Sequence, residues 1–382
     1  MKKVMFYCQH ILGMGHLVRS MEIVRGLSSN FQICFINGGE VIEGFEIPSS
    51  VQVVNIPAIK TDSEFQELEV VDSSLNLEQA QILRRNQLLN VFDQFQPDIL
   101  IIELFPFGRR RFSFELIPLL EQAKVLETKV VCSLRDIVVT KQNQARHEEK
   151  ICRLMNQYFD LLLIHGDPVF VKLEESFSRL DDLSCDVHYT GYVAQPLPEV
   201  SESQKPIILA TVGGGRFGHE LLECVVKTAP ILKKKLPHHI QMFTGPFIPE
   251  DVFVKLQNLA VNQTNITVER YTPQLLTYMK QADLSISMSG YNTTMNILRT
   301  GVRSLLLPFT GNNDQEQTIR AEKLGQLGVV DVLQPDDLQP IQFAKKVITC
   351  LSKKPHSISF DFNGVENTAA YLHQLVQKQE AA

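Results

Sequence analysis

The chain has 382 residues, of which 37 are Lys or Arg and 43 are Asp or Glu, so its formal net charge is −6. This length predicts two domains, each large enough for its own core, and the acidic balance argues against nucleic acid as a partner. No apolar stretch approaches the ~18 residues of a membrane span. The seven cysteines are scattered, which indicates free thiols in a reducing compartment and no zinc site. We therefore expect a cytoplasmic protein.

In the first half, apolar strands alternate with helices. A strand at 4–8 leads into the turn Gly13-Met14-Gly15-His16, and a helix with one apolar face follows at 17–29. Segment 61–83 holds six acids and no Lys or Arg, and we interpret it as a solvated loop, with a lid as the alternative. Further apolar runs predict strands at 31–36, 51–56, 98–102, 129–133 and 160–164.

The second half repeats this opening. Strand 207–211 leads into Gly213-Gly214-Gly215-Arg216-Phe217-Gly218. Three prolines between 193 and 206 indicate a linker, so we place domains at 1–195 and 196–364, with a last helix at 365–382 that docks on one of them. The later strands are predicted at 239–243, 265–269, 283–287, 303–307 and 328–332. Strands that alternate with helices predict an α/β fold with parallel sheets.

Both glycine turns predict anion binding, because glycine permits close approach of the backbone and the following helix start presents unpaired N–H groups. The second turn fits a dinucleotide fingerprint through Gly213, Gly215 and Gly218. However, the next strand ends without the acid that would hold the ribose of a nicotinamide cofactor. A dehydrogenase is therefore disfavoured, and the lack of any Gly-Lys dipeptide excludes a P-loop.

His16 stands at the mouth of the first turn. As a structural residue it would cap the helix that follows. Beside a ligand it would take a proton from an incoming hydroxyl, because imidazole titrates near neutrality. Arg19, one helical turn later, is expected to be solvated.

The strongest signal comes after two late strands. Strand 283–287 runs into a Ser/Gly/Asn/Thr turn at 287–294, and strand 303–307 is followed by the polar segment 311–317. Ligands of open parallel sheets bind at the carboxyl ends of the strands. The first turn suits a diphosphate, and Glu316 with Gln317 suits sugar hydroxyls. Helix caps with exposed polar residues are the alternative explanation.

Taken in order, these motifs resemble those of the two-domain GT-B glycosyltransferases. Within them the chain is similar to family 28, which includes the peptidoglycan lipid-linked N-acetylglucosaminyltransferase, and closer still to a group of predicted bacterial glycosyltransferases. The resemblance rests on segments 13–19, 105–110, 133–136, 165–168, 244–247 and 287–321. It implies two Rossmann-like domains whose parallel sheets face a central cleft, with an acceptor-binding N-terminal domain and a C-terminal domain for a nucleotide-diphosphate sugar.

The resemblance also implies the residues of the site. The diphosphate would be held by Gly213, Gly214, Gly215, Arg216, Ser289, Gly290, Tyr291, Asn292 and Thr293. Tyr271 and Thr272 would border the base, and Glu316 and Gln317 would contact the donor sugar. Asn296 replaces a glutamate that binds ribose in the family, and it lacks the charge assistance of a carboxylate. On the acceptor side the implied residues are Gly13, Gly15, Arg19 and Arg109.

The implied reaction is attack of an acceptor hydroxyl on the anomeric carbon, with inversion, as the nucleoside diphosphate departs. The chain has no Asp-x-Asp triplet, so we expect no metal and no cofactor beyond the donor substrate, a UDP-sugar. Helix N-termini and Arg216 would take the leaving charge. His16 is the first candidate for the base, and Glu103 and Asp136 stand behind it because both follow apolar runs.

The run 105–114 has two interpretations, which differ in whether the protein contacts a membrane. The run 105–114 mixes aromatic and cationic residues: it is either a helix start with its rings in the core and its arginines solvated, or a surface that rests on anionic lipid. The acceptor is accordingly a small molecule or a lipid-linked one presented at the inner face of the membrane. Alternatives on the same scaffold are a nucleotide-sugar hydrolase, a 2-epimerase and a non-catalytic nucleotide-sugar-binding protein.

Overall fold

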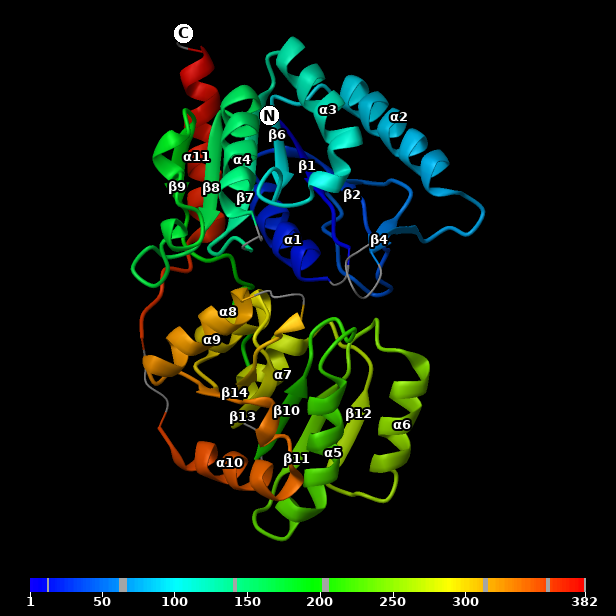
Figure 1. The fold of residues 1–382 in the computed structure, drawn as a ribbon, viewed down its shortest axis with the longest axis vertical. Helices are drawn as coiled ribbons and strands as arrows, with labels where there is room; N and C mark the ends of the chain where they lie inside the picture. The colour runs from blue at the N-terminus through cyan, green and yellow to red at the C-terminus, as the bar shows by residue number, and fades with distance from the viewer. Residues whose placement is uncertain are drawn as a thin grey trace. The chain divides into compact units, whose positions relative to one another are not determined.

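A computed structural model of the chain (Figure 1) describes residues 1–11, 14–61, 67–139, 143–200, 206–311, 315–354 and 358–380. The chain divides into two compact units. The first consists of Met1–Ile11 and His16–Val193 together with the C-terminal segment from Phe360, and the second is built mainly from Ala194–Ser359. The last helix is therefore part of the first unit.

The first unit contains a parallel sheet with strand order β3-β2-β1-β6-β7-β8-β9. Its strands are β1 (Lys3–Cys8), β2 (Gln32–Asn37), β3 (Gln52–Asn55), β6 (Ile99–Glu103), β7 (Lys129–Arg135), β8 (Leu161–His165) and β9 (Asp186–Tyr189). The strand order reverses between β1 and β6, which are neighbours in the sheet but far apart in the chain. In an open sheet of this kind, ligands bind beyond the carboxyl ends of the strands at such a switch point.

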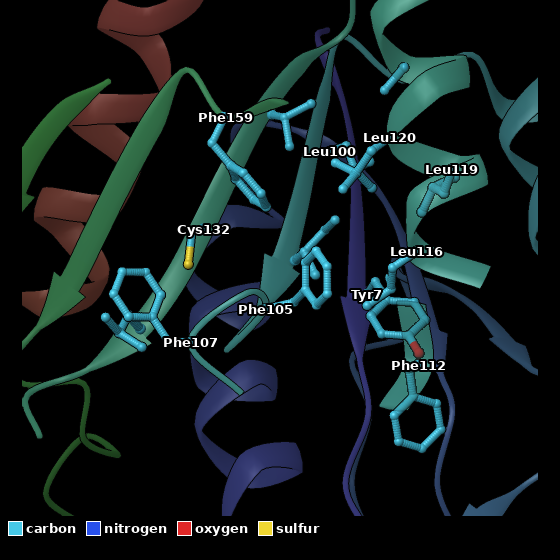
Figure 2. Close-up of a cluster of buried hydrophobic side chains, with 14 of the residues drawn as sticks. Tyr7, Leu100, Phe105, Phe107, Phe112, Leu116, Leu119, Leu120, Cys132 and Phe159 are labelled. Carbon is cyan, nitrogen blue, oxygen red and sulfur yellow. The ribbon is translucent and has the colours of Figure 1, made fainter. Parts of the chain in front are cut away.

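Helices cover both faces of this sheet. On one face, α2 (Leu77–Phe95), α3 (Ser113–Val125) and α4 (Gln144–Tyr158) bury a core that includes Tyr7, Leu100 and Cys132 (Figure 2). On β9, Val187 and Tyr189 pack against this core. His188, between them, stacks instead on Tyr371 of α11 (Gly364–Glu380), with ring centroids 4.2 Å apart. Because successive side chains of a strand alternate in direction, α11 covers the opposite face, where it also packs against α1 (Gly15–Leu27) through Val365 beside Gly26.

The loop predicted for segment 61–83 is largely wrong. Strand β4 (Ile59–Thr61) pairs antiparallel with β5 (Leu68–Val70), and α2 already begins at Leu77. Residues 62–66 lie outside the described chain. The Asn76 side chain accepts from Gln79 N (2.9 Å) and the Gln79 side chain accepts from Asn76 N (3.0 Å). This capping box starts the helix within a segment whose acidic composition had suggested a loop.

The second unit repeats the same topology, with parallel strand order β12-β11-β10-β13-β14-β15. Its strands are β10 (Ile207–Thr211), β11 (His239–Phe243), β12 (Ile266–Glu269), β13 (Leu284–Met288), β14 (Arg303–Leu307) and β15 (Asp331–Val332). Its helices are α5 (His219–Lys233), α6 (Glu250–Ala260), α7 (Leu275–Gln281), α8 (Tyr291–Thr300), α9 (Glu316–Gln326) and α10 (Pro340–Ser352). The switch point lies between β10 and β13. The predicted α/β fold with two parallel sheets is confirmed.

His165, the last residue of β8, makes stability depend on pH. It is fully buried, with Nε2 2.8 Å from Ser133 Oγ and Nδ1 2.9 Å from Thr190 Oγ1. Burial lowers the pKa of His165 to about 3, whereas in the unfolded chain it would titrate near pH 6.5. Its stabilising contribution is therefore complete above that pH and is lost as the pH falls toward 3. We expect His165 to reduce the free energy of unfolding by up to about 1.4 kcal/mol per pH unit in that window.

Urea denaturation between pH 7.5 and 5 measures this slope. His165→Asn should lower the stability at pH 7.5 but flatten the slope by about one proton's worth. An equally steep slope in the variant would show that His165 does not contribute to it.

Candidate functional site

Three of the predicted residues meet at the switch point of the first unit. Glu103, the last residue of β6, is fully buried, and His16 Nδ1 lies 2.7 Å from its Oε1. Arg19 Nη2 donates to the same oxygen. His16 and Arg19 reach one carboxylate because residues three apart share a face of α1. The expectation that Arg19 is solvated is wrong: its side chain is 1% exposed, and the ion pair with Glu103 compensates for the loss of water.

The surroundings keep Glu103 ionised and His16 neutral. Burial raises the pKa of the Glu103 carboxyl, but the hydrogen bond from His16 and the charges of Arg19 and Arg109 outweigh it and lower that pKa to about 2. Burial lowers the pKa of His16 to about 3, against the attraction of Glu103. A carboxylate only accepts hydrogen bonds, so the hydrogen of the neutral ring resides on Nδ1. Nε2 is then the nitrogen that can accept a proton.

Asp136, the third candidate base, has different surroundings. It is fully buried after β7, and its Oδ2 accepts from the Tyr192 hydroxyl at 3.3 Å. Its Cβ lies where a side chain on Gly166, just after β8, would have to fit. These neighbours place Asp136 toward β8, whereas Glu103 contacts His16 directly.

The residues predicted for the acceptor side follow β6 and β1. Arg109 Nε donates to the backbone oxygen of Gln9 at 2.7 Å. Leu104 and Arg109 have φ values of +66° and +57°, a strained conformation for residues with a side chain that persists only where the surroundings enforce it. Gly15 is the first residue of α1, and Gly13 lies outside the described residues.

The aromatic residues between β6 and α3 belong to the core. Phe105, Phe107 and Phe112 are at most 3% exposed and lie in the cluster of Figure 2, as the core interpretation of the run 105–114 requires. Of its arginines, Arg111 is exposed and Arg109 is partly buried.

In the second unit, the glycine turn after β10 is tightly packed. Gly213 and Gly215 have φ values of +68° and +90°, on either side of Gly214. A Cβ on Gly215 would lie 2.5 Å from Thr244 O, so only glycine fits. Phe247 N donates to Gly214 O at 2.9 Å, and the Arg216 guanidinium lies over the Phe247 ring, 4.8 Å from its centroid. Such a turn presents successive backbone N–H groups to an anion.

The start of α8 lies on the neighbouring strand. Ser287 on β13 is the register partner of Thr211 on β10, so the segments that follow both strands leave the same edge of the sheet. The first hydrogen bond within α8 runs from Thr294 N to Gly290 O at 2.9 Å. The N–H groups of Tyr291, Asn292 and Thr293 therefore lie at the N-terminus of the helix, before its first internal hydrogen bond. The structure thus brings the predicted diphosphate residues to the two sides of one switch point.

Glu316 and Gln317 begin α9 and are already engaged. Glu316 Oε1 pairs with Arg320 Nη2 at 3.0 Å, and the fully buried Arg320 guanidinium lies 5.3 Å from the centroid of the Tyr291 ring. Gln317 Oε1 accepts from Phe309 N at 3.2 Å, and Ser289 Oγ donates to Gln317 O at 3.1 Å. Glu316 therefore offers acceptor atoms, and Gln317 offers its amide N–H groups. Arg320 is not among the site residues predicted from the sequence, although its spacing of four from Glu316 is typical of an ion pair on a helix.

Asn296 and the two residues predicted to border the base lie in the same unit. Asn296 is 9% exposed and stands one turn after Asn292 on α8. Tyr271 and Thr272 follow the edge strand β12. Gly245, in the turn after β11, packs on the Gly213–Gly215 turn. Its N–H donates to Arg270 O at 2.7 Å, so the turn after β11 is also joined to the segment that contains Tyr271 and Thr272.

In the described part of the chain, none of the helices combines the length and the apolar character that a membrane span requires. Within those same residues, no three His, Cys, Asp or Glu side chains are grouped to hold a metal ion.

Most of the second unit, together with the start of α11, is similar to a known protein family. Residues 208–368 match the family described as glycosyltransferase family 28 C-terminal domain. The UDP-N-acetylglucosamine–N-acetylmuramyl-(pentapeptide) pyrophosphoryl-undecaprenol N-acetylglucosamine transferase of Prochlorococcus marinus is 24% identical over 195 residues, 49% of this chain and 52% of the relative. The transferase of the same name from Oenococcus oeni is 22% identical over 357 residues, 89% of this chain and 87% of the relative.

Among solved structures, MurG of Acinetobacter baumannii superposes with a TM-score of 0.57 at 15% identity, covering 99% of this chain and all of that one. That likeness concerns the fold, and the chain spans about half the length of the first relative. Together these findings confirm the resemblance drawn from the motifs. Residues 208–368 match the glycosyltransferase family 28 C-terminal domain, and the chain has the GT-B fold of glycosyltransferases.

Proposed function

We propose that the protein transfers a sugar from a UDP-sugar to an acceptor hydroxyl, with inversion and without a metal. The observation that carries the proposal is the switch point of the second unit, where the Gly213–Gly215 turn and the α8 N-terminus leave the same sheet edge. Both structures bind anionic oxygens, as the diphosphate of a donor requires. The relatives' names specify UDP-N-acetylglucosamine, which supports that donor.

In this proposal, different residues around the switch point bind the diphosphate, the sugar and the nucleoside of the donor. N–H groups of the turn and of Tyr291 to Thr293 hold the diphosphate, and together with Arg216 they stabilise the negative charge that develops on it as it leaves. Glu316 accepts a hydrogen bond from one sugar hydroxyl, and the Gln317 amide donates to another. Tyr271 and Thr272 border the base, and Asn296 binds the ribose through an uncharged amide.

In the first unit, His16 acts as the general base. Its Nε2 takes the proton of the acceptor hydroxyl while the oxygen bonds to the anomeric carbon and the bond from that carbon to the diphosphate breaks. Glu103, 2.7 Å from Nδ1, orients the ring and stabilises the imidazolium that forms. Asp136, whose carboxylate accepts from the Tyr192 hydroxyl, is the weaker candidate.

For the acceptor, we propose a lipid-linked molecule that carries phosphate. The relatives' names specify a pyrophosphoryl-undecaprenol acceptor. Arg109 and Arg135 both lower the pKa of His16, after the larger effect of burial, so two cations lie close to the base. An anionic group next to the reacting hydroxyl would relieve their repulsion. Such an acceptor requires peripheral contact with the membrane.

A panel of nucleotide sugars tests the proposal. We expect UDP-N-acetylglucosamine to raise the melting temperature and to release UDP slowly, with faster release when the lipid-linked acceptor is added. UMP, which lacks the second phosphate, serves as the control and should bind more weakly than UDP. Release of free sugar at a rate independent of the acceptor would indicate a hydrolase. An altered sugar without nucleotide release would indicate an epimerase. Binding without turnover would indicate a non-catalytic protein. If no nucleotide sugar binds, the proposal is wrong.

A further inference from the structure

A buried cation outside the residues considered so far lies at the carboxyl edge of the first unit's sheet. Arg84 of α2 is fully buried, and its Nε and Nη2 bind the two oxygens of Glu115 at 2.8 and 2.5 Å. Its Nη1 donates to Gly38 O and Pro57 O at 2.8 and 2.7 Å, and Nη2 also donates to Gln9 Oε1 at 2.6 Å. Every N–H group of the guanidinium is thus engaged.

The carboxylate that faces Arg84 is equally well satisfied. Glu115 of α3 is fully buried, and the Tyr7 hydroxyl donates to its Oε1 at 2.5 Å. Figure 2 shows the hydroxyl end of Tyr7 beside the Phe112 ring, and the Arg84 guanidinium lies 5.3 Å from the centroid of that ring. Apolar side chains of similar volume often stabilise a protein as well as a buried ion pair does. Stability alone therefore does not account for the Arg84–Glu115 pair.

The segments that Arg84 joins all lie where a ligand would bind. Gln9 follows β1, Gly38 follows β2 and Pro57 precedes β4. A Cβ on Gly38 would lie 2.2 Å from Gln9 Oε1, so the segments after β1 and β2 are closely packed at this point. Ligands of such sheets bind beyond these strand ends.

Besides Arg84, Gln9 contacts the first residue of β4 and the Arg109 side chain. It is fully buried, and its Nε2 donates to Ile59 O, the first residue of β4, at 3.0 Å. Its backbone oxygen accepts from Arg109 Nε at 2.7 Å. Arg109 in turn lies near enough to Glu103 to lower the pKa of that carboxyl, and its positive φ shows that its placement is enforced.

We infer that Arg84 is a positioning residue for acceptor binding: held by Glu115, it fixes Gln9, and Gln9 sets the place of Arg109 and of the start of β4. The role in acceptor binding rests on the proposed function, whereas the positioning of Arg109 does not.

Gln9→Met tests the relay with little change in volume. It removes the side-chain hydrogen bonds of Gln9 to Arg84, Ile59 O and His10 O but keeps the backbone oxygen. With pyrophosphoryl-undecaprenol N-acetylmuramyl-pentapeptide as the probe acceptor, we expect the acceptor KM to rise ~10-fold or more, because small misplacements of binding groups are amplified in reactivity. The KM for UDP-N-acetylglucosamine should stay within about twofold, since the donor residues lie in the other unit. Arg85→Met, at the exposed neighbouring position on α2, should leave both constants unchanged.

A second measurement separates this inference from the proposed function. In ¹H–¹⁵N spectra of the arginine side chains, the Arg109 Nε–H signal should be protected from exchange in the wild type and lose that protection in Gln9→Met and in Arg84→Lys, which has fewer donors. If the wild type transfers nothing to the probe acceptor, the proposed function is wrong for that acceptor while the spectra still test the relay. An unchanged Arg109 signal in the folded Gln9→Met variant, or an unchanged acceptor KM, would overturn the inference.

Discussion

His16→Ala is expected to lower the turnover of sugar transfer by about 100-fold or more, with little change in the affinity for UDP. The imidazole is the group whose free nitrogen can take the proton of the acceptor hydroxyl, because Glu103 binds the opposite nitrogen at 2.7 Å. Alanine removes the base and leaves the nucleotide residues of the other unit unchanged. Turnover under saturating donor and acceptor, with calorimetry of UDP binding, measures the two effects separately.

Two further variants make this result specific. Glu103→Gln keeps the shape of the carboxyl but no longer demands a hydrogen on Nδ1, so it should lower turnover as well, through the wrong tautomer of His16. His188→Ala removes a histidine that stacks on Tyr371 and should leave turnover within about twofold. If His16→Ala turns over at the wild-type rate, His16 is not the base.

Gly215→Ala should weaken UDP binding by roughly 10-fold to 100-fold. The new Cβ would lie 2.5 Å from Thr244 O and 3.0 Å from Ile248 N, and the φ of +90° is one that alanine rarely adopts. The turn must therefore shift, and its N–H groups lose their common aim at the diphosphate. Isothermal titration with UDP gives the change in affinity.

Gly301→Ala provides the matched control for this prediction. Gly301 ends α8 with a φ of +70°, but a Cβ there would meet nothing within 4 Å. The control therefore carries a similar backbone penalty, about 1 kcal/mol of stability, without the clash, and should bind UDP like the wild type. Equal affinity in the two variants would show that the glycine turn does not hold the nucleotide.

Much of the fold was predictable because local patterns carry it. Strands 239–243 and 303–307 coincide with β11 and β14, since continuous apolar runs between turn residues are typical of buried parallel strands. The start of α2 was missed at Asn76, where the capping pair with Gln79 was hidden in an acidic segment. The order of the motifs supported the GT-B fold, because each strand–turn–helix unit is specified by neighbouring residues.

The site was predictable only in part. The sequence by itself determined which turns present N–H groups and which strands end in polar residues, because glycine, helix starts and apolar runs act locally. Only the tertiary structure decided that Glu103 meets His16 and Arg19, that Arg320 holds Glu316 against Tyr291, and that Arg84 reaches Gln9. The contacts of Glu103 with His16 and Arg19, and that of Arg84 with Gln9, join residues more than 70 positions apart. The physical reason is that periodicity states which face of an element is buried, whereas the order in which strands pair states what that face will touch.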